Sequence, residues 1–204
     1  DSGLESGIYS GMAKIYIQQG QLKEAIKGYS KARKIQKRQL REIDKRVMES
    51  HKPNNFAQDE AVKLDQQKVE LQGQEAAVLH QLATIYIQWG QLKKAECLCR
   101  KSLKIKEHIG DKKGKARTLC QLASIYHYQG KDSEAAKLYF NCFRIQEQIG
   151  DREGQADTLC HIATIYALGH HFDEAVKYYQ HVLKIYEDIN KPKSKVETLF
   201  TLAN

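Results

Sequence analysis

Residues 119–150 decide the fold of this chain, with the sequence LCQLASIYHYQGKDSEAAKLYFNCFRIQEQIG, because the pattern returns at residues 159–190 as LCHIATIYALGHHFDEAVKYYQHVLKIYEDIN. In the first half of this stretch, apolar residues fall at i, i+3, i+4 and i+7, the spacing of one helix face: Leu119, Leu122, Ala123 and Tyr126. A turn at residues 129–131 separates them from a second helical stripe: Ala135, Leu138, Tyr139 and Cys142. Each copy therefore predicts two helices joined by a tight turn.

The same pattern occurs twice more and then begins again at the end of the chain. Forty residues before Leu119 it is matched by Leu79, Leu82, Ala83, Tyr86, Gly90, Ala95 and Cys99. Near the amino terminus it is matched by Tyr9, Met12, Ala13, Tyr16, Gly20, Ala25 and Tyr29. A last copy starts with Leu199, Leu202 and Ala203. One helix pair cannot bury its own apolar stripe, so we expect neighbouring pairs to stack.

The connectors between copies carry helix-ending and helix-starting residues. Gly110 and Gly150 stand where a glycine favours the end of a helix, and Asp111 and Asp151 follow as plausible N-caps. In the fourth copy His170 replaces the turn glycine, although a glycine stands one residue earlier.

These alanines, tyrosines and turn glycines resemble the signature of the tetratricopeptide repeat. The period of 40 residues exceeds the family's usual length of about 34. It is similar to the longer-repeat branch of kinesin light chains, G-protein-signalling modulators and regulatory arms of bacterial signal-transduction ATPases. The resemblance implies an all-α, right-handed superhelix of helix-turn-helix repeats. A single domain at 1–204 would hold repeats at 3–35, 76–109, 112–149 and 152–189, and the start of a fifth at 194–204.

An insertion separates the first two repeats, because Tyr16 and Tyr86 lie 70 residues apart. Helical patterning continues to Met48, breaks at residues 52–55 and resumes from Ala57. We therefore expect an extended helical hairpin at 36–75, with a turn near residue 53. Its first arm (residues 33–52) has eight basic and three acidic residues, and its second arm (58–75) has five acidic and two basic ones. Two roles stay open, a partner-specific arm or a solvated insertion without a role.

The resemblance also implies a concave groove lined by the first helix of each repeat. The groove residues carried over by frame are His80, Gln81, Thr84, Gln88, Arg117, Gln121, Ser124, His127, His161 and Thr164. The family's clamp for a terminal carboxylate needs lysines and asparagines that these positions lack. Gln81, Gln121 and His161 instead occupy positions where the longer-repeat proteins grip a peptide backbone with amides, since an amide both donates and accepts hydrogen bonds.

Catalytic, cofactor, metal and membrane functions have little support. The chain lacks an HExxH motif, and Cys97 and Cys99 would point to different sides of a helix. No apolar run approaches the roughly 20 residues that a membrane span needs. The five cysteines lie within helical patterns, so we expect small packing residues in a reducing, cytoplasmic compartment rather than a disulfide framework. The chain starts without methionine and ends as a helix begins, which predicts a fragment of a longer protein.

The most probable function is a scaffold that binds a peptide segment of a partner protein. An RNA-binding module is the first alternative, because the net charge is +8 and basic residues cluster at Lys112, Lys113, Lys115 and Arg117. These bases alternate with acidic residues elsewhere, a pattern that usually serves solvation only. The second alternative is a regulatory or spacer arm of a larger ATPase or signalling protein. The sequence alone leaves the oligomeric state open.

Overall fold

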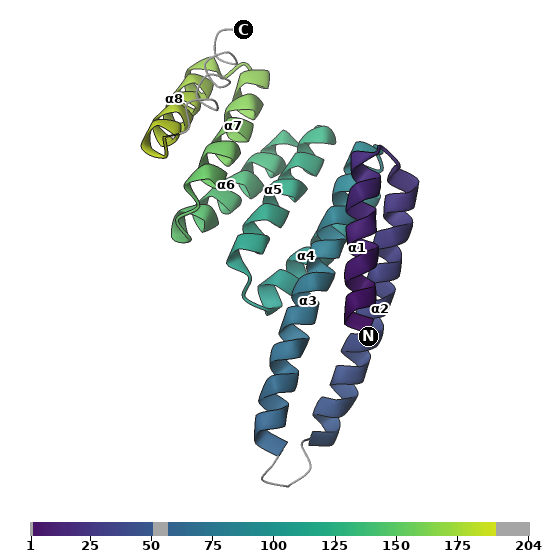
Figure 1. Ribbon diagram of the computed structural model, residues 1–204. Coiled ribbons are helices and arrows are strands. Elements are labelled where there is room, and N and C mark those ends of the chain that lie inside the picture. Colours follow the sequence, from purple (N-terminus) through teal and green to yellow (C-terminus); the bar gives the residue numbers. More distant parts are fainter. Residues whose placement is uncertain (1, 51–56, 191–204) are drawn as a thin grey trace. The chain divides into compact units, whose positions relative to one another are not determined.

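A computed structural model describes residues 2–50 and 57–190, and within them the chain forms eight α-helices and no strand (Figure 1). They belong to two compact units, residues 1–111 and 112–204. The first unit contains α1 (Ser2–Gln18), α2 (Leu22–Ser50), α3 (Ala57–Gln88) and α4 (Leu92–His108). The second contains α5 (Lys112–Tyr128), α6 (Asp132–Gln148), α7 (Arg152–Leu168) and α8 (Phe172–Asp188). The all-α repeat fold is thus confirmed. The fifth copy, expected from residue 194, lies outside the described residues.

Small residues allow the two helices of each repeat to approach closely. In the second unit Ala123 of α5 and Ala135 of α6 are fully buried, and Tyr139 is 1% exposed beside them. In the first unit Ala13, Ala25 and Tyr29 take the same places on α1 and α2. Because these alanines are fully buried, the packed interior has no room for a larger side chain at their positions, and the tyrosine ring packs beside them. The predicted role of these alanines and tyrosines is confirmed.

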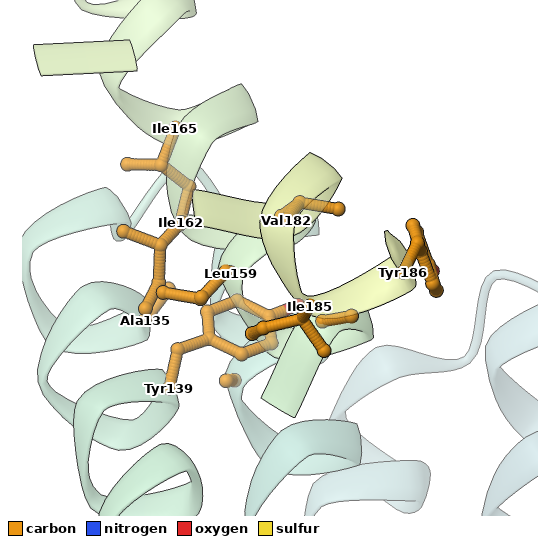
Figure 2. Close-up of a cluster of buried hydrophobic side chains, with 10 residues drawn as sticks. Ala135, Tyr139, Leu159, Ile162, Ile165, Val182, Ile185 and Tyr186 are labelled. Atoms are coloured by element: carbon orange, nitrogen blue, oxygen red, sulfur yellow. The ribbon is translucent and has the colours of Figure 1, made fainter. Parts of the chain in front are cut away.

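The second helix of one repeat also packs on the first helix of the next. This joins α2 to α3 in one unit and α6 to α7 in the other. Figure 2 shows the core that results in the second unit, where side chains of α6, α7 and α8 meet. Its buried members include Tyr139, Leu159, Ile162, Val182 and Ile185. Helices α3 and α7 are thus each held both by the second helix of their own repeat and by that of the preceding repeat.

The inserted segments are helical and lie against each other. Figure 1 shows α2 and α3 continuing past the end of α1. Leu64 within this extension is 2% exposed, so the arms bury apolar surface as well as pairing charges. Ion pairs join them between Asp44 and Lys68 at 2.6 Å and between Arg46 and Glu60 at 3.0 Å. Exposed pairs of this kind contribute about 0–1 kcal/mol each. The turn expected at residues 52–55 lies outside the described residues.

The tight turns need residues with positive φ. Gly110 and Gly150 adopt φ of 72° and 69° after α4 and α6, as their positions predict. Asp151 caps α7, since its side chain accepts a hydrogen bond of 3.0 Å from the Gly154 amide. In the fourth repeat His170 itself adopts φ of 60°, and Gly169 does not take over the role of the missing turn glycine.

Replacing His170 with glycine should therefore stabilise the second unit. A left-handed conformation costs a residue with a side chain about 1–2 kcal/mol, and glycine avoids this cost. Part of that gain is lost because glycine gives up more conformational entropy on folding. We expect the free energy of unfolding to rise by about 0.5–1 kcal/mol in His170→Gly, measured by urea denaturation. The reverse change Gly130→His should lower it by a similar amount, because nothing lies within 4 Å of a Cβ built there. Equal stabilities for His170→Gly and the wild type would contradict this account of the turn.

Candidate binding surface

The ten predicted groove residues lie on α3, α5 and α7, and none of them is fully buried. In the first unit α3 carries His80, Gln81 and Thr84, which are half-buried, and Gln88, which is exposed. In the second unit α5 carries Arg117, which is exposed, and three half-buried residues, Gln121, Ser124 and His127. His161 and Thr164 are exposed on α7. Each unit thus has its own set of predicted groove residues, and in both sets the side chains are polar and are half-buried or exposed.

The hydroxyl groups in these sets already have partners inside the protein. Thr84, Ser124 and Thr164 each donate to the carbonyl oxygen four residues earlier, at 2.9–3.2 Å. In the second unit Ser124 also lies 2.8 Å from the hydroxyl of Tyr139, and Thr164 lies 3.2 Å from that of Tyr179. These hydroxyls therefore position the tyrosines of the second helices. We did not predict this contact from the sequence. Its signal is a serine or threonine 15 residues before the tyrosine of the second helix, as in Ser124 with Tyr139 and Thr164 with Tyr179.

His161 stacks on one of these tyrosines. Its ring lies 5.0 Å from that of Tyr139, with the planes 15° apart. Although part of His161 is exposed, the packing of its ring against the protein removes water from the imidazole and lowers its pKa, and the nearby carboxylate of Asp157 opposes that shift. Burial also raises the pKa of Asp157, which accepts a hydrogen bond of 3.2 Å from the Tyr186 hydroxyl. The imidazole is thus neutral near pH 7 and offers one donor and one acceptor.

Apolar side chains lie near the ends of the first helices in the second unit. Tyr128 of α5 is 64% exposed and Leu168, its counterpart one repeat later on α7, is 61% exposed. The repeat frame predicts both residues for the concave face. Seven residues earlier on the same helices, Gln121 and His161 supply hydrogen-bonding groups. The surface can therefore hold apolar side chains and polar backbone groups of the same ligand.

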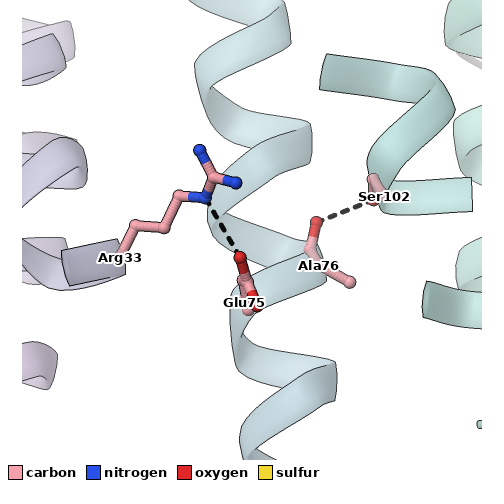
Figure 3. Close-up of polar contacts among 4 residues, drawn as sticks. All are labelled: Arg33, Glu75, Ala76 and Ser102. Carbon is pink, nitrogen blue, oxygen red and sulfur yellow. Dashed lines mark hydrogen bonds and ion pairs between the residues drawn. The ribbon is translucent and has the colours of Figure 1, made fainter. Parts of the chain in front are cut away.

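Two of the five cysteines form a disulfide, so the expectation of five packing thiols is wrong for them. Cys120 of α5 is bonded to Cys142 of α6, with Cα atoms 5.9 Å apart. The forty-residue repeat did not predict this disulfide, because the neighbouring repeats have Ser102 and Val182 at the position of Cys142 and so do not repeat the cysteine pair. Ser102 donates to the carbonyl oxygen of Ala76 at 2.8 Å (Figure 3). Cys142 takes the same place, with its Sγ 3.1 Å from the carbonyl oxygen of Ala116.

The remaining three cysteines are not disulfide-bonded, and their surroundings differ. Cys97 is exposed, Cys160 is half-buried and Cys99 is fully buried. Burial raises the pKa of the Cys99 thiol to about 12. Within residues 2–50 and 57–190, no group of three or more His, Cys, Asp or Glu side chains is arranged to hold a metal ion. No helix in these ranges has the length and apolar character of a bilayer span.

Comparison with known families and structures places the repeats. Models of the tetratricopeptide repeat match residues 6–38, 74–141 and 114–188. No functionally curated protein matches the chain.

Several solved structures share its fold. BtubC (BKLC) from P. vanneervenii is 17% identical with a TM-score of 0.69, over 94% of this chain and 66% of that protein. Two structures of a putative kinesin light chain from Podosopora anserina are each 22% identical over 93% of this chain. One has a TM-score of 0.54 over 97% of that chain, and the other has a TM-score of 0.53 over 98% of it. A signal-transduction ATPase with a tetratricopeptide repeat sensor from Pyrococcus horikoshii is 18% identical with a TM-score of 0.55, over 94% of this chain and 32% of that protein.

The disulfide predicts how many thiols the chain exposes on unfolding. Denatured without reductant, the protein should react with Ellman's reagent at three thiols, those of Cys97, Cys99 and Cys160. After reduction it should react at all five. Reduction should also lower the free energy of unfolding of the second unit by about 3 kcal/mol, because the bond closes a loop of 22 residues. Five reactive thiols before reduction would contradict the cross-link, and a Cys120→Ala, Cys142→Ala variant provides the reductant-insensitive control.

Proposed function

Because the chain belongs to the tetratricopeptide repeat family, we propose that it is a protein-interaction module that binds an extended segment of a partner protein. The segment lies along the first helices of the repeats. Nothing in the described residues supports a catalytic role, and no cofactor is part of the proposal.

The observation that carries this proposal is the mixed surface of α5 and α7 in the second unit. Gln121 and His161 occupy equivalent positions one repeat apart and provide both donors and acceptors. An extended peptide exposes its N–H and C=O groups along its length, and such side chains match them without selecting a particular residue. The exposed Tyr128 and Leu168 beside them supply apolar contact for alternate peptide side chains.

The internal hydrogen bonds divide the predicted groove residues by role. Ser124 and Thr164 are committed to Tyr139 and Tyr179, so in our proposal they support the surface from below. His127 lies 2.6 Å from Asp132 through its Nδ1 atom, which limits its freedom to turn toward a ligand. We assign direct contacts to Gln121 and His161, because both can donate and accept hydrogen bonds, and to the exposed Arg117. In the first unit His80, Gln81, Thr84 and Gln88 form the corresponding set on α3.

Nucleic-acid binding is the second candidate, favoured by one feature of α4. A hollow of about 650 Å³ along this helix is lined by Lys93, Glu96, Cys97, Arg100, Lys101, Leu103, Lys104 and Glu107. Four basic residues stand there against two acidic ones. Arg100 is already paired with Glu96 at 3.0 Å, which lowers the positive charge that phosphates would meet. A regulatory role, as the sensor region of the P. horikoshii ATPase suggests by name, is compatible with peptide binding.

The proposal is tested by capturing partners from cell extract and mapping the bound segment as a synthetic peptide. The double variant Gln121→Ala, His161→Ala should weaken binding of that peptide by about tenfold or more, measured by isothermal titration calorimetry. Gln148→Ala, a change of an exposed amide on α6, should leave it unchanged.

Nuclease and salt separate the two candidates. A peptide partner survives nuclease treatment, whereas binding through phosphates is lost with nuclease and falls steeply as the salt concentration rises. Equal affinities of the wild type and the double variant for the mapped peptide would remove α5 and α7 as its binding surface.

A further inference from the structure

Exposed charges of opposite sign stand near the starts of α5 and α7. Lys113 and Arg117 lie four residues apart on α5, and Glu153 and Asp157 occupy the equivalent positions of the next repeat on α7. All four residues are exposed. A four-residue spacing places each like-charged pair on one face of its helix. Each pair lies one turn before the hydrogen-bonding residue that we assign to direct contact with the peptide.

Helix stability does not explain these pairs. Like charges four residues apart on a helix repel each other. The cation of Lys113 also opposes the helix dipole, because it lies in the first turn of α5, which has no acidic residue. On α3 the same two positions hold Gly73 and Ala77, so the repeat packs without any charge there. The charges are thus specific to α5 and α7, as expected for contacts with a ligand.

The two helices do not neutralise each other's charges. No side-chain ion pair or hydrogen bond involves Lys113 or Arg117 within residues 2–50 and 57–190. On α7, loss of surrounding water raises the pKa of Asp157, and the neighbouring carboxylate of Glu153 raises it further. A cationic group of a ligand would favour the ionised form of Asp157 and so oppose both effects.

The cation at the start of α7 does not offset these carboxylates. The guanidinium of Arg152 is bound to Asp188 of α8 at 2.9 Å and to Gln155 at 2.9 Å. The surface is therefore basic at the start of α5 and acidic at the start of α7. A nucleic acid would meet repulsive carboxylates one helix away from the cations, so this surface favours a ligand that carries both signs.

The two helices lie close enough for one short segment to reach both pairs. Cys120 of α5 has its Sγ atom 3.3 Å from Oγ1 of Thr158 on α7, so the helices are side by side in the second unit. The axes of packed helices are about 8–10 Å apart, and an extended peptide advances about 3.3 Å per residue. Peptide side chains about two to four residues apart therefore match the separation of the two helices.

We propose that the segment bound in this groove carries an acidic side chain that contacts Lys113 and Arg117 and a basic side chain that contacts Glu153 and Asp157. This inference rests on the proposed peptide-binding function and adds the charge pattern of the partner. Amide and imidazole groups hydrogen-bond a peptide backbone in either direction, whereas opposite charges on neighbouring helices match only one order of acid and base. The charges thus fix the direction in which the segment runs from α5 to α7.

Selection from a phage-displayed library of random dodecapeptides tests this charge pattern, with the whole chain as bait. We expect enriched peptides to carry an acidic and a basic residue at a constant short separation and in one constant order. In an exchange variant with Lys113→Glu, Arg117→Glu, Glu153→Lys and Asp157→Lys, that order should be reversed, because each helix then attracts the opposite charge. The exchange leaves the net charge of the chain unchanged.

Isothermal titration calorimetry with synthetic peptides makes the test quantitative. A peptide enriched on the wild type should bind the exchange variant about tenfold or more weakly, because like charges then face each other on both helices. Exchanging the acidic and basic residues of the peptide should restore most of the affinity. The matched control is Glu134→Lys with Lys137→Glu, since both residues are exposed on α6, outside this surface. It should leave the affinity unchanged.

Two single variants keep the test decisive if urea denaturation shows that the exchange variant is unfolded. Arg117→Gln should weaken binding only of peptides that keep the acidic residue. Asp157→Asn should weaken binding only of peptides that keep the basic residue. A general loss of structure would weaken all peptides alike.

Three results would overturn the inference: enriched peptides without an acidic and basic pair, the same order on the wild type and the exchange variant, or equal affinities of these two proteins for the selected peptide. The proposed peptide binding would stand in these cases if the double variant Gln121→Ala, His161→Ala lost the enriched peptides. A chain that enriches no peptide would count against both.

Discussion

Buried alanines with a tyrosine packed beside them are the interaction on which the helix pairs α1–α2 and α5–α6 depend. Ala123, Ala135 and Tyr139 make it in the second unit, and Ala13, Ala25 and Tyr29 make it in the first. A larger side chain at either alanine would separate the helices, because a close-packed interior has no room for added methylenes. The separation would also move the tyrosine away from the next repeat, so both packing layers rest on this contact.

That constraint divides the surface of the first helices α3 and α7. One side faces its own second helix, a second side meets the preceding repeat, and the rest stays near water. Side chains on the part near water can differ between repeats, as His161 does from Gln81 and Gln121 at the equivalent positions. Binding chemistry can therefore vary along the repeats while the packing residues repeat.

Two findings show how repeat-specific contacts depart from the frame. The disulfide joins Cys120 to Cys142, whereas the neighbouring repeats have Ser102 and Val182 in place of the second cysteine. The turn after α7 uses His170 in a left-handed conformation rather than shifting to the adjacent glycine. In both cases equivalent positions of the repeats hold different side chains, and in the turn His170 adopts the same left-handed conformation as the glycines of the other repeats.

The sequence by itself determined the helix pairs, their turns and the alanine–tyrosine core, since these follow from spacings of three, four and forty residues that are local or repeated. It also placed the ten predicted groove residues on first helices, where the structure has them on α3, α5 and α7. Only the tertiary structure decided that Ser124 is held by Tyr139, that Cys120 meets Cys142, and that Ile8 is exposed while Val78 is buried. The reason is that such contacts depend on which helix lies opposite, and residues of the same type in the same frame differ only in their neighbours.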